Sequence, residues 1–290
     1  MNGIFGPGEI VSILIIAANG YLSYRGFSDR AFFERYIFHI ERIVSYREPV
    51  RIVSSAFLHA NWPHLIFNMF ALYTFSAGVQ RVFGIAGYLL IYFGSLVAGS
   101  LLALYIHRGH GAYRAVGASG AVSGVVFASI VAYPHSSIMF LLLPVPIPAW
   151  LFGIGFVLIS IFGIGVRAGN IGHEAHLGGA IAGVVLALLL RPELATMHPW
   201  IVMAIVIPMV AFLIIAARNP ALLRIGERLA RKKESMRRRY DASRRRDLQE
   251  EMDRLLDTVN ERGLEGLSPR ERKRLQELAE QKRQRNERQQ

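Results

Sequence analysis

The stretch RAVGASGAVSGVVFASIV, residues 114–131, decides how the rest of the chain is interpreted. Most of it is an apolar run with the composition of a membrane helix, yet that run opens with Gly117, Ala118, Ser119 and Gly120. A polar group inside a membrane is costly unless it faces the protein interior or a hydrated cavity. Ser119 therefore has two explanations: it allows two helices to pack closely, or it is a reactive group.

Apolar runs on both sides of this stretch indicate an all-α polytopic membrane protein. The chain has 290 residues, of which 52% are hydrophobic, and a membrane-spanning helix needs about 20 apolar residues. Three prolines in LLPVPIPAW, residues 142–150, predict that the fifth span bends or starts late. The predicted spans are residues 8–24, 63–80, 84–106, 118–133, 138–165, 173–190 and 198–217.

Three of these spans carry polar residues at their amino-terminal ends. The second has His64 and Asn68, which are four residues apart and so share one helical face. The fourth has Ser119, and the sixth has His173 and His176. The second, fourth and sixth spans cross the membrane in the same direction, so these ends lie on one side. Polar side chains from three helices at one depth favour a reactive site.

Helix packing explains part of the same pattern. Small residues recur four apart as Gly120 and Gly124 and as Gly179 and Gly183, a spacing that lets helix backbones approach closely. Ser119 considered alone fits this explanation. Together with a histidine of the sixth span, it also matches a nucleophile and its general base, the pairing that activates a weakly acidic hydroxyl.

Two other intramembrane chemistries are not supported by the residues. HEAH, residues 173–176, places its histidines three apart, whereas a zinc-protease helix places them four apart, and no third ligand stands out. Aspartate is absent from residues 30–240, which excludes a catalytic pair of aspartates there. The chain has no cysteine, so a thiolate metal site is excluded as well. We expect no metal and no cofactor.

The motifs resemble those of the rhomboid family of intramembrane serine proteases. GASG, residues 117–120, is similar to that family's G-x-S-G, and AHLGGAIAG, residues 175–183, is similar to its A-H-x-x-G-x-x-x-G. HANWPHLIFN, residues 59–68, resembles its second-span element, in which a histidine precedes an asparagine by four. The three motifs occur in order on the expected spans, and the similarity covers about residues 48–190.

This resemblance implies a six-helix rhomboid-like core and a role for each matching residue. Ser119 would be the nucleophile and His176 its general base, a dyad without an acid. Asn68 and His64 would assist the oxyanion alongside the backbone N–H of Ser119. The supporting glycines implied by the motifs are Gly117, Gly120, Gly179 and Gly183.

Two positions depart from the family pattern. Val50 precedes Arg51 where many members have tryptophan, which predicts a difference in how the first loop is seated. Ser123 stands four residues after Ser119, where an aromatic side chain often packs on the catalytic imidazole. His176 must therefore be oriented by another residue.

The predicted domains are a catalytic core over residues 1–195, a seventh transmembrane helix over 196–218 and a basic soluble tail over 219–290. In the tail, the basic run of residues 231–247 is followed by apolar residues at helical spacing and by Gly263 as a stop. SPRE, residues 268–271, is a capping box that starts a second helix. The tail is thus predicted to contain a small helical hairpin.

These features predict an intramembrane serine endopeptidase acting on transmembrane protein substrates. The alternative is a catalytically inactive rhomboid-fold protein that binds or escorts membrane clients. A transporter is disfavoured because Glu174 and Glu193 are the only acidic residues from the second span to the end of the seventh. Membrane lipids are expected partners, the tail is expected to contact anionic lipid or a protein, and no specific nucleic acid is expected. The expected location is a bacterial or archaeal cell membrane.

The side of the membrane that the site faces is predicted differently by charge and by resemblance. The chain after residue 217 contains 22 of the Lys and Arg residues against 14 Asp and Glu, and positive charge favours the cytoplasmic side. Seven spans would then place the active-site ends in the cytoplasm too. The resemblance implies the opposite for the core, with the site opening away from the cytoplasm, and we favour that orientation while leaving the tail undecided.

Overall fold

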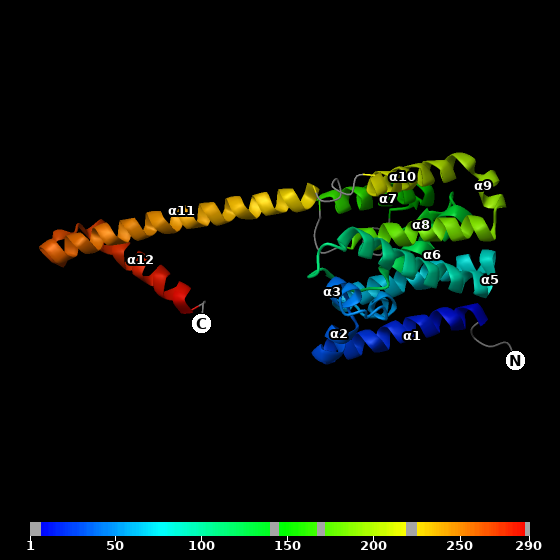
Figure 1. The fold of residues 1–290 in the computed structure, drawn as a ribbon, viewed down its shortest axis with the longest axis horizontal. Coiled ribbons are helices and arrows are strands. Elements are labelled where there is room, and N and C mark those ends of the chain that lie inside the picture. The colour runs from blue at the N-terminus through cyan, green and yellow to red at the C-terminus, as the bar shows by residue number, and fades with distance from the viewer. Residues whose placement is uncertain (1–6, 140–144, 167–171, 219–224, 288–290) are drawn as a thin grey trace. The chain divides into compact units, whose positions relative to one another are not determined.

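The computed structural model describes residues 7–139, 145–166, 172–218 and 225–287. The chain forms two compact units, Met1–Gly226 and Glu227–Gln290, and each is described by itself. In the first unit, the long helices run side by side as a bundle (Figure 1).

The described apolar helices of the first unit account for the predicted spans. They are α1 (Pro7–Ser28), α5 (Trp62–His107), α6 (Ser119–Ala132), α7 (Ala149–Val166), α8 (His173–Leu190) and α10 (Pro199–Arg218). Shorter elements connect them: α2 (Arg30–Tyr36), β1 (Phe38–His39), α3 (Ile40–Val44), α4 (Arg51–Ser54), the 3₁₀ helix η1 (Ser55–Phe57), β2 (Arg114–Ala115), β3 (Ser137–Ile138), β4 (Ile147–Pro148) and α9 (Glu193–Met197).

Helix α5 contains both the second and the third predicted spans. Its 46 residues break at Gly84, whose φ of 71° lies in the left-handed region that favours glycine. The chain thus turns within one helical element, and the two apolar segments on either side of Gly84 correspond to the spans predicted over 63–80 and 84–106.

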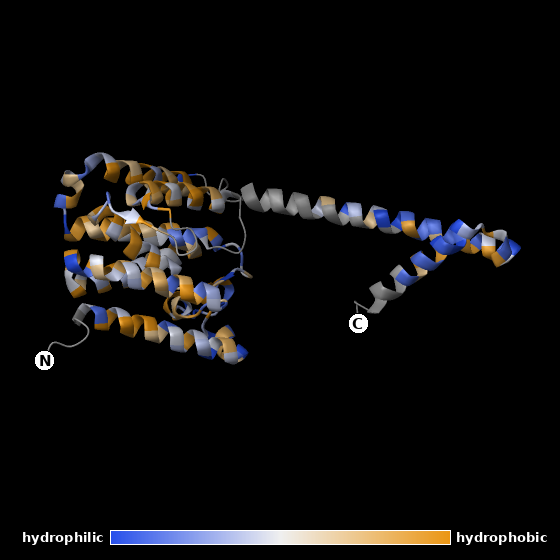
Figure 2. Ribbon diagram, turned by 180° about the vertical axis from the view of Figure 1, so that it is seen from behind, coloured by the Kyte–Doolittle hydropathy of each residue, from blue (hydrophilic) through white to orange (hydrophobic). Residues whose placement is uncertain are grey.

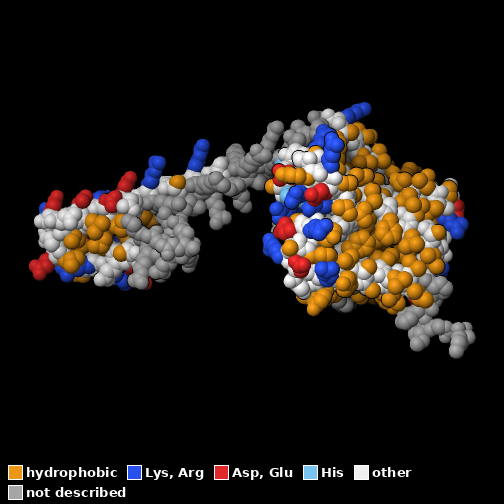
Figure 3. Space-filling model, turned by 60° about the horizontal axis from the view of Figure 1, so that its bottom comes forward, with side chains coloured by type: hydrophobic (Ala, Val, Ile, Leu, Met, Phe, Trp, Pro, Cys, Tyr) orange, Lys and Arg blue, Asp and Glu red, His pale blue; other side chains and the backbone are white. Residues whose placement is uncertain are grey.

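The membrane character of the first unit is visible on its surface. Four described helices, α1, α5, α8 and α10, are long and apolar enough to cross a membrane, and α6 and α7 are shorter apolar helices. Much of the length of these helices has the orange colour of hydrophobic residues in Figure 2. In Figure 3, hydrophobic side chains cover the flank of this unit, and charged side chains gather mainly at one end. The protein is therefore an all-α, multi-pass membrane protein, as predicted.

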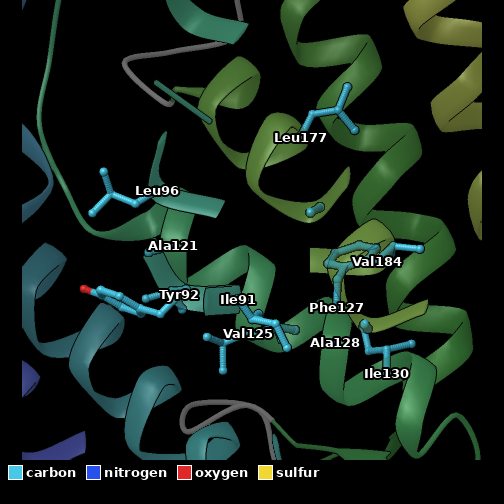
Figure 4. Packing of buried hydrophobic residues seen from close by; sticks show 14 of the residues in the cluster. Ile91, Tyr92, Leu96, Ala121, Val125, Phe127, Ala128, Ile130, Leu177 and Val184 are labelled. Atoms are coloured by element: carbon cyan, nitrogen blue, oxygen red, sulfur yellow. The ribbon is translucent and has the colours of Figure 1, made fainter. Parts of the chain in front are cut away.

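Helix α6 lies at the centre of the bundle, between α5 and α8. All its residues from Gly120 to Val131 are buried. Figure 4 shows part of the surrounding cluster, with Tyr92 of α5, Phe127 of α6 and Val184 of α8. A helix apolar on all sides belongs in the core of a larger assembly of helices, and here that helix begins at Ser119.

Glycine contacts bring α8 against α6. A Cβ added to Gly179 would collide with the backbone carbonyl of Gly120, and one added to Gly183 would collide with that of Gly124. Three of these positions, Gly120, Gly179 and Gly183, were predicted as supporting glycines. Their packing role is direct, because the obstacle in each case is backbone and cannot rotate away.

Replacing Gly179 with alanine should therefore destabilise the bundle. Overpacking against rigid neighbours typically costs about 1–3 kcal/mol, so the thermal midpoint of the detergent-solubilised protein should fall by several degrees. Gly155→Ala on α7 is the matched control, because a Cβ there would meet nothing within 4 Å. Equal midpoints for the two variants would contradict the close approach of α6 and α8.

The fifth predicted span, residues 138–165, was placed too early. Helix α7 begins at Ala149, and Ser137–Ile138 instead pairs with Ile147–Pro148 as a two-stranded ribbon. Proline lacks a backbone N–H and fits the ends of elements better than their interiors, which agrees with the predicted delayed start. Residues 140–144 of this stretch lie outside the described residues.

The second unit contains a helical hairpin. Helix α11 (Ile225–Arg262) ends just before Gly263, whose φ is 71°, and α12 (Pro269–Glu287) follows the short 3₁₀ helix η3 (Leu264–Gly266). The predicted capping box is present, since the Glu271 carboxylate accepts from the Ser268 backbone N–H at 2.8 Å. Arg274 of α12 donates two hydrogen bonds to Glu251 of α11.

The predicted basic run of the tail is helical. Residues 231–247 lie within α11, because Arg and Lys are good helix formers and add no barrier to continuing the helix. Residues 219–224, where the predicted tail begins, lie outside the described residues.

Candidate active site

One cavity of about 980 Å³ gathers most of the predicted site residues. Its lining includes Ser119 at the start of α6, His176 in the first turn of α8, and His64 and Asn68 in the first two turns of α5. Gly117 lines it as well. The predicted meeting of three helix ends is thus found in the structure.

Ser119 begins its helix directly after a sharp backbone turn. Gly117 has a φ of 126°, which side-chain-bearing residues rarely adopt, and its backbone N–H donates to the Ser55 carbonyl at 3.1 Å. A Cβ on Gly117 would lie 2.6 Å from the His64 imidazole. Glycine at this position therefore permits both the turn and the close approach of His64.

His176 is partly exposed and faces the same cavity. No hydrogen bond among the described residues joins its ring to the Ser119 hydroxyl; such bonds are often long before substrate binds. The Phe156 ring of α7 has its centroid 6.0 Å from that of His176. This aromatic neighbour comes from a different helix than the one on which the family pattern places it, and Ser123 itself is buried in α6.

The two side chains predicted for the oxyanion are held by the first turns of α5. Asn61 caps the helix by accepting from the His64 backbone N–H at 2.9 Å. The Asn68 side-chain amide donates one of its two N–H groups to the His64 carbonyl at 2.9 Å. That bond fixes the plane of the amide at the cavity wall.

Sequence reasoning missed His59, which lies between η1 and α5 and is fully buried. Its Nε2 accepts from the Ala118 backbone N–H at 3.4 Å, and its Nδ1 donates to the Ser23 hydroxyl at 2.9 Å. Ser23 in turn donates to the Phe57 carbonyl. Burial lowers the pKa of the His59 imidazole to about 3, so the ring is neutral and can accept a hydrogen bond. His59 thus holds the backbone of Ala118, the residue just before Ser119.

A second missed group lines the cavity itself. Glu174 of α8 accepts from His107 Nε2 at 2.7 Å and from the Tyr113 hydroxyl, and the His107 and Tyr113 rings are stacked with centroids 3.7 Å apart. In the sequence, Glu174 was considered as part of a zinc motif that fails on spacing and as one of two acidic residues that are too few for a transporter. The partners stand 67 and 61 positions away, too far for a local pattern to pair them.

Arg51 seats the loop that precedes α5. It is 4% exposed and donates to the backbone carbonyls of Glu34 and Ile37 at 2.9 and 3.0 Å. It also donates to Glu48 at 2.5 Å, and this guanidinium holds the pKa of the Glu48 carboxyl below its ordinary value. Val50 is exposed, so the arginine anchors this segment while the replaced tryptophan position faces outward.

Comparison with known proteins identifies the family. The family model described as the Rhomboid domain matches residues 46–193, more than half of the chain. The chain belongs to the Rhomboid family. The resemblance seen in the three motifs is therefore confirmed.

Curated relatives are similar over the same region. The chain is 34% identical to "Rhomboid protein 1, mitochondrial" of Saccharomyces cerevisiae over 47% of its own length and 40% of that protein. It is 27% identical to "RHOMBOID-like protein 12, mitochondrial" of Arabidopsis thaliana over 64% and 59%, and 30% identical to "Rhomboid protease GluP" of Bacillus subtilis over 47% and 25%. The chain thus spans between a quarter and about three fifths of these relatives.

A second family model matches the hairpin unit. It covers residues 235–281 and is described as a family of unknown function, DUF6576. The match covers parts of α11 and α12 and the connection between them, so the hairpin corresponds to a recognisable sequence unit.

Proposed function

We propose that this protein is an intramembrane serine endopeptidase that uses Ser119 and His176 as a catalytic dyad. The observation that carries the proposal is one cavity, within the Rhomboid-matched residues, lined by a serine, a histidine and an asparagine from three helices. A hydroxyl nucleophile, a base that activates it and a hydrogen-bond donor for the oxyanion are the groups that acyl transfer uses.

In the proposed reaction, the Ser119 oxygen attacks the substrate carbonyl while His176 takes the hydroxyl proton. The carbonyl oxygen becomes an oxyanion, which the Ser119 backbone N–H, Asn68 and His64 stabilise. His176 then gives its proton to the leaving amine, and the C–N bond breaks to leave an acyl-enzyme. Water from the cavity hydrolyses this ester with His176 again acting as the base.

The substrate is proposed to be a transmembrane protein segment that unwinds near the membrane surface. A helix keeps its carbonyls in intrahelical hydrogen bonds, so Ser119 reaches one only after local unwinding. Segments containing glycine or other weak helix formers lose less on unwinding and should be cleaved preferentially.

A serine-directed fluorophosphonate probe tests this proposal in isolated membranes. Attack on the probe needs the Ser119 hydroxyl and a base, so the wild-type protein should be labelled at Ser119 and the His176→Ala variant should not. An inactive rhomboid-fold protein that only binds or escorts clients would remain unlabelled. The proposal would be overturned if the wild-type protein were not labelled by the probe and also did not cleave a model transmembrane substrate.

The proposed membrane is a bacterial or archaeal cell membrane with the active site opening away from the cytoplasm. This orientation can be tested cleanly because the chain contains no cysteine. Single cysteines at the exposed positions Ala112, on the active-site end, and Ser235, in α11, can be probed in intact cells with a membrane-impermeant maleimide.

Labelling of Ala112→Cys is the expected result. Labelling at Ser235→Cys as well would mean that the apolar helices cross seven times and leave the hairpin outside. Labelling at Ala112→Cys alone would mean an even number of crossings and a cytoplasmic hairpin, where its positive charge is favoured to contact anionic lipid or a protein partner. Labelling at neither position overturns the proposed orientation.

A further inference from the structure

Three side chains from three parts of the chain, two of them buried and one partly buried, meet in the wall of the active-site cavity. Glu174 is the second residue of α8, His107 is the last residue of α5, and Tyr113 belongs to the connection between α5 and α6. Glu174 and His107 are 5% and 6% exposed. All three line the cavity, and we call them the Glu174 cluster.

The cluster joins the segments that carry the proposed reacting groups. Glu174 precedes His176 by two residues in the first turn of α8, and Tyr113 precedes Gly117 by four on the way to Ser119. The strand pair between Phe38–His39 and Arg114–Ala115 also holds this connection. A shift of α8 relative to this connection would change the separation of His176 from Ser119.

The start of α8 has no side-chain cap. Its N-cap is Gly172, which has no side chain to bond the first-turn N–H groups. Close backbone contacts place Ala175 and Gly178 against α5 and Gly179 against α6. Hydrogen bonds depend on angle as well as distance, so the two bonds to Glu174 add a directional constraint on the rotation of this end.

We propose that Glu174 is a positioning residue for the Ser119–His176 pair, because its bonds to His107 and Tyr113 fix the first turn of α8 against α5 and the α5–α6 connection. This inference rests on the proposed protease function. Glu174 does not touch the reacting atoms in this scheme and transfers no proton.

A carboxylate suits this position for two reasons. One of its oxygens accepts from both the His107 ring and the Tyr113 hydroxyl, and negative charge is favoured in the first turn of a helix. The second ring nitrogen of His107, Nδ1, is buried with no hydrogen-bond partner among the described residues. The His107 side chain therefore depends on Glu174 for its one hydrogen bond.

Steady-state cleavage of a model transmembrane substrate by three variants tests the proposal. Glu174→Ala should lower kcat by about 10- to 100-fold and leave KM within about threefold, because misplacing a reacting group by about 1 Å costs up to about 10²-fold. Glu174→Gln keeps an oxygen that accepts both bonds and should restore kcat to within about fivefold of wild type. Glu193→Ala, an exposed acid beyond the other end of α8, should match wild type.

A stability control separates positioning from general loss of structure. Ile205→Ala removes a fully buried side chain of α10, outside the Rhomboid-matched residues, and rates are compared per folded protein after gel filtration. Full kcat in Glu174→Ala, an equal kcat loss in Ile205→Ala, or no recovery in Glu174→Gln would each overturn the positioning role. An inactive wild type that also resists the serine-directed probe would instead refute the protease function itself.

Discussion

Replacing either Ser119 or His176 with alanine should abolish cleavage of a model transmembrane substrate. Without the hydroxyl no acyl-enzyme forms, and without the imidazole nothing takes the proton from a serine that is weakly acidic at neutral pH. Loss of one member of such a pair typically costs on the order of 10⁴-fold or more in turnover. Both variants should therefore fall to the background of the cleavage assay.

The folded structure should survive both changes. Ser119 and His176 are partly exposed at the cavity, and neither has a side-chain hydrogen bond in the described structure whose loss would leave a buried partner unpaired. Thermal midpoints should lie within a few degrees of wild type. Ser123→Ala, one turn further along α6 and outside the cavity lining, should retain activity, as should the surface variant His135→Ala.

Near-normal turnover in Ser119→Ala or His176→Ala would eliminate the dyad. The double variant adds a second check, because two residues acting in one step are not additive. It should be no less active than either single variant.

The sequence predicted those parts of the site that depend on local pattern. The spans were recognisable because a membrane crossing needs a long apolar run. Counting the crossings then showed that the amino-terminal ends of the second, fourth and sixth spans lie on one side of the membrane. That reasoning placed His64, Asn68, Ser119 and His176 on one side, and the structure brings them to one cavity.

Long-range partners were not visible in the same way. Phe156 lies beside His176 although nothing in the spacing of α7 marks it, and Ser23 supports His59 from 36 positions away. Such pairs depend on how whole helices pack against each other, and this packing leaves no repeating pattern of residues in a single sequence. His59 is the first residue of the motif HANWPHLIFN. Its position just before a capped helix was the one sequence feature that could have pointed to it.

Asn68→Ala should lower kcat by about 10²–10³-fold, which corresponds to about 3–4 kcal/mol of transition-state stabilisation. One N–H of the Asn68 amide is held by the His64 carbonyl, so the plane of the amide is set before substrate arrives. The second N–H is the donor that we propose for the oxyanion. Because the oxyanion exists only after attack, loss of this donor should lower kcat and leave KM within about threefold.

Asn68→Leu separates the donor from the volume of the side chain. Leucine fills similar space on α5 but has no N–H, so it should show the same loss of kcat as alanine. The His64 carbonyl remains within the helical hydrogen-bond ladder in both variants, so thermal midpoints should stay close to wild type. If KM rises while kcat is unchanged, Asn68 contacts the substrate in its ground state; if leucine restores turnover, the side chain only fills space. Either result removes Asn68 from the oxyanion site and leaves the Ser119 N–H and His64 to stabilise the charge.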